Sequence, residues 1–236
     1  MASKLSVLLF CVVCIFGAEG FINKCKSDDD ACIQTSAKAA YAHMVAGDNT
    51  LGVEPSDPIF VDKIEGNFAN LKFLFSKTTL VGLGSCAVEN VKLNLEASSL
   101  KADLICPSFD FQGDYAIDGV LITLPIEGNG KFSIKCKKYK LGVDANLNTV
   151  TGDDGESHMH IKNFKLNIDG QGGVVFDFQN LFNGDKELSD AVHKFANENW
   201  KIVSEEFQRP IFEENFKRLV KNINKFLKTT PKDIFL

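Results

Sequence analysis

The chain has 236 residues and a formal net charge of −5. A mildly acidic balance argues against nucleic acid and anionic membrane surfaces as main partners, because both repel a negative protein. Phenylalanine is unusually common, with 20 residues against three tyrosines and one tryptophan. Because Phe carries apolar surface without a hydrogen-bonding group, this bias suits either a large apolar interior or an ordinary packed core.

The first twenty residues predict a secretory signal peptide. Lys4 precedes an apolar run of about a dozen residues, Leu5–Phe16, and small residues follow as far as Gly20. A membrane anchor is the alternative, but the run is too short to cross a bilayer and no later stretch is long enough. We therefore expect residues 1–20 to be removed and residues 21–236 to form a single secreted, soluble domain.

A short helix is predicted from about Asp29 to Val45. Consecutive aspartates, Asp28–Asp30, suit a helix N-terminus because carboxylates interact favourably with its unpaired N–H groups. Gly47 and Asp48 end the helix. Its apolar face comprises Ile33, Ala37, Ala40, Tyr41 and Met44.

Five cysteines remain after cleavage of the signal peptide: Cys25, Cys32, Cys86, Cys106 and Cys136. In an oxidising environment this number indicates two disulfides and one free thiol. Cys25 and Cys32 are close in sequence, and a bridge between them would fasten the incoming segment to the first turn of the helix. The spacing fits no zinc site.

Apolar and polar residues alternate from about Phe60 to Phe178, which predicts β-strands. The apolar phase changes by one residue at Pro107-Ser108 and again at Lys137-Lys138. Such a change inside a long strand indicates a bulge, which bends a sheet sharply. The apolar series are Leu100, Ala102, Leu104 and Cys106, then Phe109, Phe111, Tyr115 and Ile117; and Phe132, Ile134 and Cys136, then Tyr139, Leu141, Val143, Ala145 and Leu147.

Glycine-rich or polar turns join these strands into an antiparallel meander. The predicted turns are Ala97–Ser99, Gly128–Gly130, Thr151–Gly155 and Gly170–Gly173. Cys106 and Cys136 each come just before a phase change on strands that we expect to be adjacent. We therefore predict a Cys106–Cys136 disulfide, which leaves Cys86 as the free thiol.

A long helix is predicted from about Asp185 to Lys228, with Pro210 as a kink or interruption. At about 1.5 Å per residue it would span roughly 65 Å, which exceeds the diameter of a compact domain of this size. A helix with so long an apolar face needs an equally long apolar partner. The bent sheet is the only candidate in the sequence.

Motifs for catalysis are missing from the sequence, so we expect a binding protein and no enzyme, cofactor or metal. The nearest run to a nucleophile motif, Gly82–Cys86, lacks its second glycine. His158 and His160 lie two residues apart without a clustered third ligand, and we interpret them as surface residues. The acidic run Asp153-Asp154-Gly155-Glu156 is too short for a Ca²⁺ loop and is interpreted as a solvated turn.

Four stretches resemble the insect juvenile-hormone-binding and takeout family of secreted carriers. They are Cys25-x6-Cys32; Pro55-x-Asp57-Pro58; Phe109-x-Phe111-x-Gly113-Asp114-Tyr115 followed by Gly119-x5-Pro125-Ile126-x-Gly128-x-Gly130; and Asn197-x-Asn199-Trp200 with Pro210 downstream. The closing run Thr230–Phe235 is also similar to the family's ending. Together these stretches cover almost the whole mature chain.

The resemblance implies an α+β fold in which a highly curved antiparallel sheet wraps a long C-terminal helix, related to tubular lipid-binding domains. It implies an internal tunnel for juvenile hormone, another terpenoid or a long-chain lipid, in a protein secreted into a haemolymph-like fluid. It also implies the Cys25–Cys32 bridge. The hormone-binding branch has a second bridge further along its chain, where this sequence has no cysteine. That departure favours a takeout-like or divergent member.

Such a ligand would bind between the sheet and the helix. We expect the protein neither to bind nucleic acid nor to insert stably into a membrane. The candidate lining residues are Phe109, Phe111, Phe132, Ile134, Phe176 and Phe178 from the sheet, with Phe195, Val203 and Phe207 from the helix. Tyr115 is the candidate polar contact because it shares the phase of Phe109 and Phe111, although its hydroxyl would equally suit the sheet rim. The alternative function is a signalling or structural protein with a packed core that binds a protein partner.

Overall fold

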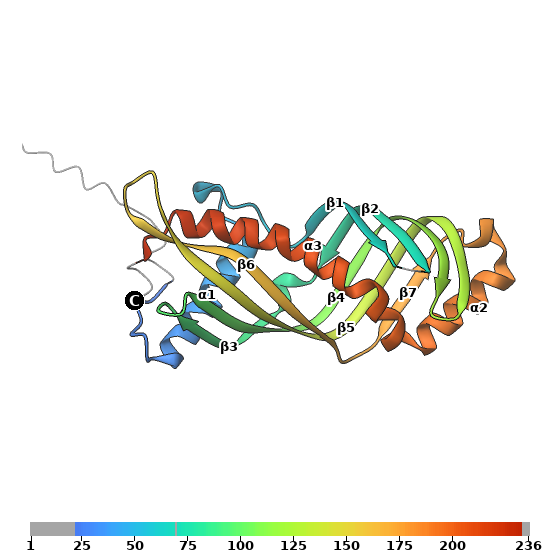
Figure 1. The fold of residues 1–236 in the computed structure, drawn as a ribbon, viewed down its shortest axis with the longest axis horizontal. Coiled ribbons are helices and arrows are strands. Elements are labelled where there is room, and N and C mark those ends of the chain that lie inside the picture. The colour runs from blue at the N-terminus through green and yellow to red at the C-terminus, as the bar shows by residue number, and fades with distance from the viewer. Residues whose placement is uncertain (1–21, 69, 233–236) are drawn as a thin grey trace, which may run out of the picture.

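The computed structural model describes residues 22–68 and 70–232 (Figure 1). The signal peptide predicted for residues 1–20 lies outside the described residues. The helices are α1 (Asp30–Ala46), α2 (Lys186–Glu198) and α3 (Trp200–Lys228). The strands are β1 (Ile59–Asn67), β2 (Leu71–Val81), β3 (Ala87–Asn94), β4 (Ser99–Leu121), β5 (Leu124–Thr151), β6 (Ser157–Gly170) and β7 (Val174–Phe178). Short 3-10 turns lie at Asn49–Leu51, Leu83–Ser85 and Phe182–Gly184.

All the strands given above pair antiparallel in one sheet. The long strands β4 and β5 form its central pair. These strands are 23 and 28 residues long and pair from Ser99↔Asn146 to Leu121↔Leu124. In one half of the sheet, β3 flanks β4 and β6 flanks β5. In the other half, β2 with β1 flanks β4 and β7 flanks β5. The sheet therefore has two halves along its length, called below the β3/β6 half and the β1/β7 half.

The predicted phase changes are confirmed, and they lie opposite each other. The pairs Cys106↔Tyr139 and Ser108↔Lys137 flank Pro107 and Lys138, and the register is the same on both sides. Each strand therefore carries one extra residue at the same level. Buried residues move from even to odd numbers in both strands there, so the interior face is kept across the bend.

The turn predicted at Gly128–Gly130 is wrong, because these residues lie inside β5 and pair with β4. A Cβ at Gly128 would lie 2.9 Å from the Cα of Leu181, and one at Gly130 would lie 2.5 Å from the carbonyl oxygen of Gln179. These glycines therefore allow close backbone approach inside the sheet. The actual turn falls at Ile122-Thr123, where Ile122 has a φ of +58°. This conformation is unusual for a β-branched residue.

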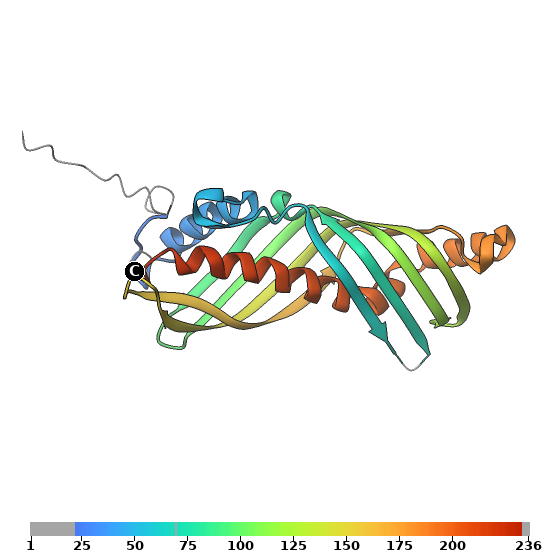
Figure 2. The ribbon, with the colours of Figure 1, turned by 90° about the horizontal axis from the view of Figure 1, so that it is seen from above.

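Helix α3 closes the open side of the curved sheet. The sheet order runs from β1 to β6, and α3 packs against both of these outer strands. Figure 2 shows α3 lying along the length of the molecule between them. The expected architecture, a curved antiparallel sheet around a long C-terminal helix, is confirmed.

The long helix is interrupted at Asn199, and the alternative of an interruption at Pro210 is wrong because α3 continues through it. Asn199 has φ −108° and ψ 31°, and both its backbone N–H and its side-chain amide donate to the carbonyl of Phe195. Helix α3 then runs from Trp200 through Pro210 to Lys228. Asn197 exchanges hydrogen bonds with the backbone of Phe176 in β7. The Asn197-x-Asn199-Trp200 run thus ends α2 and attaches it to the sheet.

The predicted Cys106–Cys136 disulfide is wrong, since Cys86 pairs with Cys106 and Cys136 is a buried free thiol. Cys106 lies opposite Tyr139 on β5, whereas Cys136 lies opposite Phe109, three positions away along β4. Cys86 instead precedes the Ala87↔Ile105 pair by one residue, which places it beside Cys106 at a Cα–Cα distance of 4.1 Å. Cys25 and Cys32 are joined, as expected.

We expect Cys136 to resist alkylation in the folded protein. Burial raises the pKa of its thiol to about 12, so little reactive thiolate forms at neutral pH. Iodoacetamide labelling followed by mass spectrometry should modify Cys136 only after denaturant is added. Labelling of native protein at the unfolded rate would contradict the burial.

Candidate functional site

The β3/β6 half of the molecule encloses an apolar cavity of about 200 Å³. Its walls come from α1, from β3, β4, β5 and β6, and from the C-terminal part of α3. All five residues of the apolar face predicted for the first helix line it: Ile33, Ala37, Ala40, Tyr41 and Met44. Helix α1 extends from Asp30 to Ala46, close to the predicted range, with Asp29 as its N-cap. The helix therefore serves as one wall of a hollow.

The opposite walls follow from the strand alternation. Six residues of the predicted alternating series line the cavity: Leu100, Ala102 and Leu104 on β4, and Val143, Ala145 and Leu147 on β5. Met159, Ile161 and Phe164 on β6 complete the sheet wall, and Phe216, Leu219, Ile223 and Phe226 line it from α3. Four wall positions are alanines, from both α1 and the sheet: Ala37, Ala40, Ala102 and Ala145. Small side chains at these four wall positions leave more of the interior unfilled than larger side chains would.

The buried polar side chains of the wall are already paired within the protein. The Ser36 hydroxyl donates to the carbonyl of Asn23 at 3.0 Å and accepts its N–H at 3.1 Å. The Tyr41 hydroxyl donates to the carbonyl of Leu83 at 2.9 Å, and burial raises its pKa. The cavity surface therefore offers dispersion contacts and almost no free hydrogen-bonding groups.

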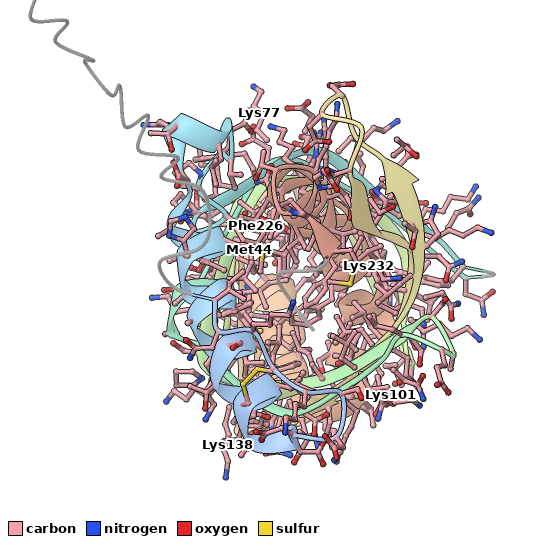
Figure 3. All side chains as sticks on the ribbon, turned by 90° about the vertical axis from the view of Figure 1, so that its left-hand side faces the viewer. Met44, Lys77, Lys101, Lys138, Phe226 and Lys232 are labelled. Atoms are coloured by element: carbon pink, nitrogen blue, oxygen red, sulfur yellow. A yellow bond between two sulfur atoms is a disulfide. The ribbon has the colours of Figure 1, made fainter. Side chains whose placement is uncertain are left out.

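Figure 3 looks along the molecule from the end that carries α1 and the C-terminal end of α3. The cavity residues Met44 and Phe226 are visible from this end, together with Lys232 near the end of α3. The cavity is thus placed at the end of the tube where the two ends of the described chain meet.

Most of the predicted lining residues lie in the β1/β7 half instead, where side chains fill the interior. Phe109, Phe111, Phe132, Ile134, Phe176, Phe178, Val203 and Phe207 are each at most 5% exposed, and Phe195 is half-buried on α2. The space among Phe109, Phe111, Ile134, Phe176 and Phe207 is only about 20 Å³. Their role as ligand contacts stays a prediction.

Tyr115 also lies in the packed half, among aromatic rings. Its hydroxyl donates to the carbonyl of Gln179 at 2.7 Å, and its ring meets that of Phe178 edge-on at 4.8 Å. Burial raises the pKa of Tyr115 to about 12. The hydroxyl is therefore hydrogen-bonded to the segment that follows β7, and Tyr115 does not line the cavity of the β3/β6 half.

Two further features bear on chemistry. Within residues 22–68 and 70–232 no cluster of three or more His, Cys, Asp or Glu side chains is arranged to hold a metal ion. The helices of the same described ranges include none that is both long and apolar enough to cross a membrane. His158, interpreted from the sequence as a surface residue, is fully buried.

Comparisons with known proteins agree with this architecture. The chain matches the family described as "Haemolymph juvenile hormone binding protein (JHBP)" over residues 6–236. The crystal structure of Epiphyas postvittana Takeout 1 superposes with a TM-score of 0.84 at 32% identity, covering 91% of this chain and 99% of that one.

Two sequence relatives are more distant. The "Circadian clock-controlled protein daywake" of Drosophila melanogaster is 28% identical over 244 residues, covering 97% of this chain and 93% of that protein. A Schistocerca gregaria protein named "Putative beta-carotene-binding protein" is 20% identical over 176 residues, covering 74% of this chain and 70% of that protein.

Proposed function

Because the chain belongs to the haemolymph juvenile hormone binding protein family, we propose that it is a secreted, non-enzymatic carrier that holds a small hydrophobic ligand in the cavity of the β3/β6 half. In this proposal residues 1–20 are a signal peptide, and residues 21–236 form one carrier domain that works in a haemolymph-like fluid. The observation that supports it most directly is the hollow itself. A cavity of about 200 Å³ with an apolar wall is unusual in a packed interior, where voids larger than a water molecule are few.

The energetics of burial are sufficient for tight binding. A ligand of sesquiterpenoid size has roughly 300–400 Å² of apolar surface, and at about 25 cal/mol per Å² its burial supplies at most about 8–10 kcal/mol before ordering costs. Submicromolar affinity is therefore within reach. Since most wall residues are apolar, burial of apolar surface supplies most of the binding free energy.

The wall also restricts the ligand chemistry. A buried ester or hydroxyl without a partner costs about 1–3 kcal/mol, and Ser36 and Tyr41 are engaged with the backbone. The part of the ligand inside the cavity is accordingly hydrocarbon, such as a terpenoid or a long acyl chain, with any polar group outside the apolar wall. The Schistocerca gregaria relative, whose name assigns it beta-carotene, supports an isoprenoid among the candidates.

We expect Ala40→Phe to weaken binding of a fluorescent apolar probe by about tenfold or more, which corresponds to about 1.4 kcal/mol or more. Ala40 is a buried wall residue of α1, so a benzyl group there would occupy the cavity. Probe titration by fluorescence measures the affinity, and native mass spectrometry of protein from its source identifies the bound ligand.

Ala39→Phe is the matched control, since Ala39 lies on the same helix but does not line the cavity. It should keep the wild-type affinity, and thermal melts of both variants check folding. If wild-type protein takes up no probe and carries no ligand, the carrier proposal fails. The core would then be that of a protein that binds a partner through its surface.

A further inference from the structure

His158, at the start of β6, is held between the end of α3 and the β5–β6 turn. Its side chain is 0% exposed. Nδ1 lies 3.2 Å from the carbonyl oxygen of Leu227 and 3.0 Å from that of Thr230. Nε2 lies 3.0 Å and 3.1 Å from the two carboxylate oxygens of Asp154. The carbonyl oxygens are acceptors only, and so are the carboxylate oxygens of Asp154 when it is ionised. Both ring nitrogens therefore face hydrogen-bond acceptors.

A neutral imidazole has one N–H and cannot donate from both nitrogens, whereas the imidazolium can. The four surrounding oxygens are consequently satisfied together by the cation. Burial by itself lowers the pKa of His158, but the hydrogen bonds to Asp154 and to the carbonyls of Thr230 and Leu227 outweigh it, so the pKa lies above its ordinary value. The carbonyls belong to the end of a helix, where the helix dipole also favours a cation.

Two other charged residues, Lys228 and Glu156, belong to the segments packed around the ring. Lys228, on the last turn of α3, places Nζ 2.9 Å from the neighbouring carboxylate of Asp153. Glu156 donates its backbone N–H to Asp154. On β5 the residue paired with His158 is Val150, which carries no charge. Asp154 is thus the carboxylate that faces the ring directly.

The groups held by His158 belong to the end of the ligand cavity. Leu227, whose carbonyl accepts from the ring, lines the cavity, as do its neighbour Phe226 and the residue that follows His158, Met159. Pro231 forms an isolated antiparallel bridge with His158. If the ring releases the carbonyls, the turn that follows α3 loses two contacts with the sheet at the end of the cavity.

We propose that His158, as an imidazolium between Asp154 and the end of α3, is a pH-sensitive clasp that retains the ligand, and that its deprotonation speeds ligand escape. The ligand readout of this inference rests on the proposed carrier function. The clasp itself is a property of the ligand-free chain.

The direction of the pH dependence follows from the two partners. A group with a raised folded pKa stabilises the fold fully below its unfolded value of 6.5, and this contribution is lost as the pH rises through the folded pKa. The pKa of Asp154 is lowered, first by its hydrogen bond from His158, so the carboxylate stays ionised at and above its ordinary value of 3.8. The clasp therefore holds fully below about pH 6.5 and opens as the pH rises through the raised pKa of His158.

The test compares Asp154→Asn with Asp153→Asn in the full mature chain. Asp154 is half-exposed, so its replacement should not prevent folding. Release of a bound apolar probe is followed by stopped flow from about pH 6 to about pH 9, a range that spans the titration of histidine. Wild-type protein and Asp153→Asn should release faster as the pH rises, with a common midpoint. Asp154→Asn should move the midpoint down by about one pH unit, because it removes the opposite charge.

Two measurements without ligand separate this inference from the carrier proposal. Imidazole NMR should show His158 titrating with a pKa above 6.5 that falls in Asp154→Asn, and the protection of the Thr229 and Thr230 amides, relative to the intrinsic exchange rate at each pH, should fall over the same pH range. An absence of probe uptake with a titrating clasp overturns only the carrier proposal. Release that is independent of pH, or a midpoint that Asp153→Asn moves as far as Asp154→Asn, overturns the clasp.

Discussion

Phe75→Ala should lower the free energy of unfolding by about 3–5 kcal/mol, the usual loss for removal of a fully buried phenylalanine. Phe75 is 0% exposed and lies at the centre of the aromatic packing in the β1/β7 half. Its ring centroid is 4.5 Å from that of Phe132 and 4.9 Å from that of Phe73. Phe111, Phe178 and Phe207 surround it at 5.8 to 6.3 Å.

Denaturant unfolding followed by circular dichroism measures this loss. Phe60→Ala is the matched control, because Phe60 lies on the adjacent strand β1 but is 66% exposed. Its replacement should change stability by no more than about 0.5 kcal/mol. Folded Phe75→Ala protein should keep its probe affinity, since Phe75 does not line the cavity. Equal losses in the two variants would show that the β1/β7 half is not the packed half.

Local periodicity predicted the parts of the fold that depend on neighbours in sequence. The apolar face of α1 and the two phase changes in β4 and β5 were readable because alternation and helical spacing fix which side chains share a face. The sequence did not show that Pro107 and Lys138 face each other. That relation depends on pairing between distant segments.

Three of the errors concern glycine, proline and asparagine residues whose local composition was misleading. Gly128 and Gly130 have the composition of a turn, but they make room for the backbone of Leu181 and Gln179. Pro210 has the composition of a helix break, but α3 continues through it. The helix breaks at Asn199, beside the hydrogen bonds that Asn197 makes to β7.

Most of the predicted lining residues and the cavity of about 200 Å³ lie in different halves of the sheet. Phenylalanine content indicates an apolar interior without telling whether it is filled. The predicted lining phenylalanines of the sheet are buried in the β1/β7 half, and four alanines from α1 and the sheet line the cavity of the β3/β6 half. The alanines at 37, 40, 102 and 145 were the available signal. These alanines could be interpreted as cavity residues only once the structure showed which segments pack together.

Removal of the Cys86–Cys106 bridge by the double replacement Cys86→Ala and Cys106→Ala should cost about 3 kcal/mol of stability. The bridge closes a loop with a sequence separation of 20 residues. Cys25 and Cys32 are separated by only 7 residues. Since the stabilisation grows with the logarithm of loop length, the corresponding Cys25→Ala and Cys32→Ala protein should lose about 1 kcal/mol less.

Denaturant unfolding of the two double variants, both with Cys136 intact, gives this comparison directly. Non-reducing peptide mapping of the wild type should recover Cys86 with Cys106, and Cys136 as a thiol. A Cys106–Cys136 peptide would contradict the register, because Cys136 pairs with Phe109 and Cys106 with Tyr139. A larger loss from the shorter loop would mean that the Cys25–Cys32 bridge acts mainly on the folded state. Since Cys25 lines the cavity, that outcome would connect the first bridge to the shape of the ligand site rather than to chain entropy.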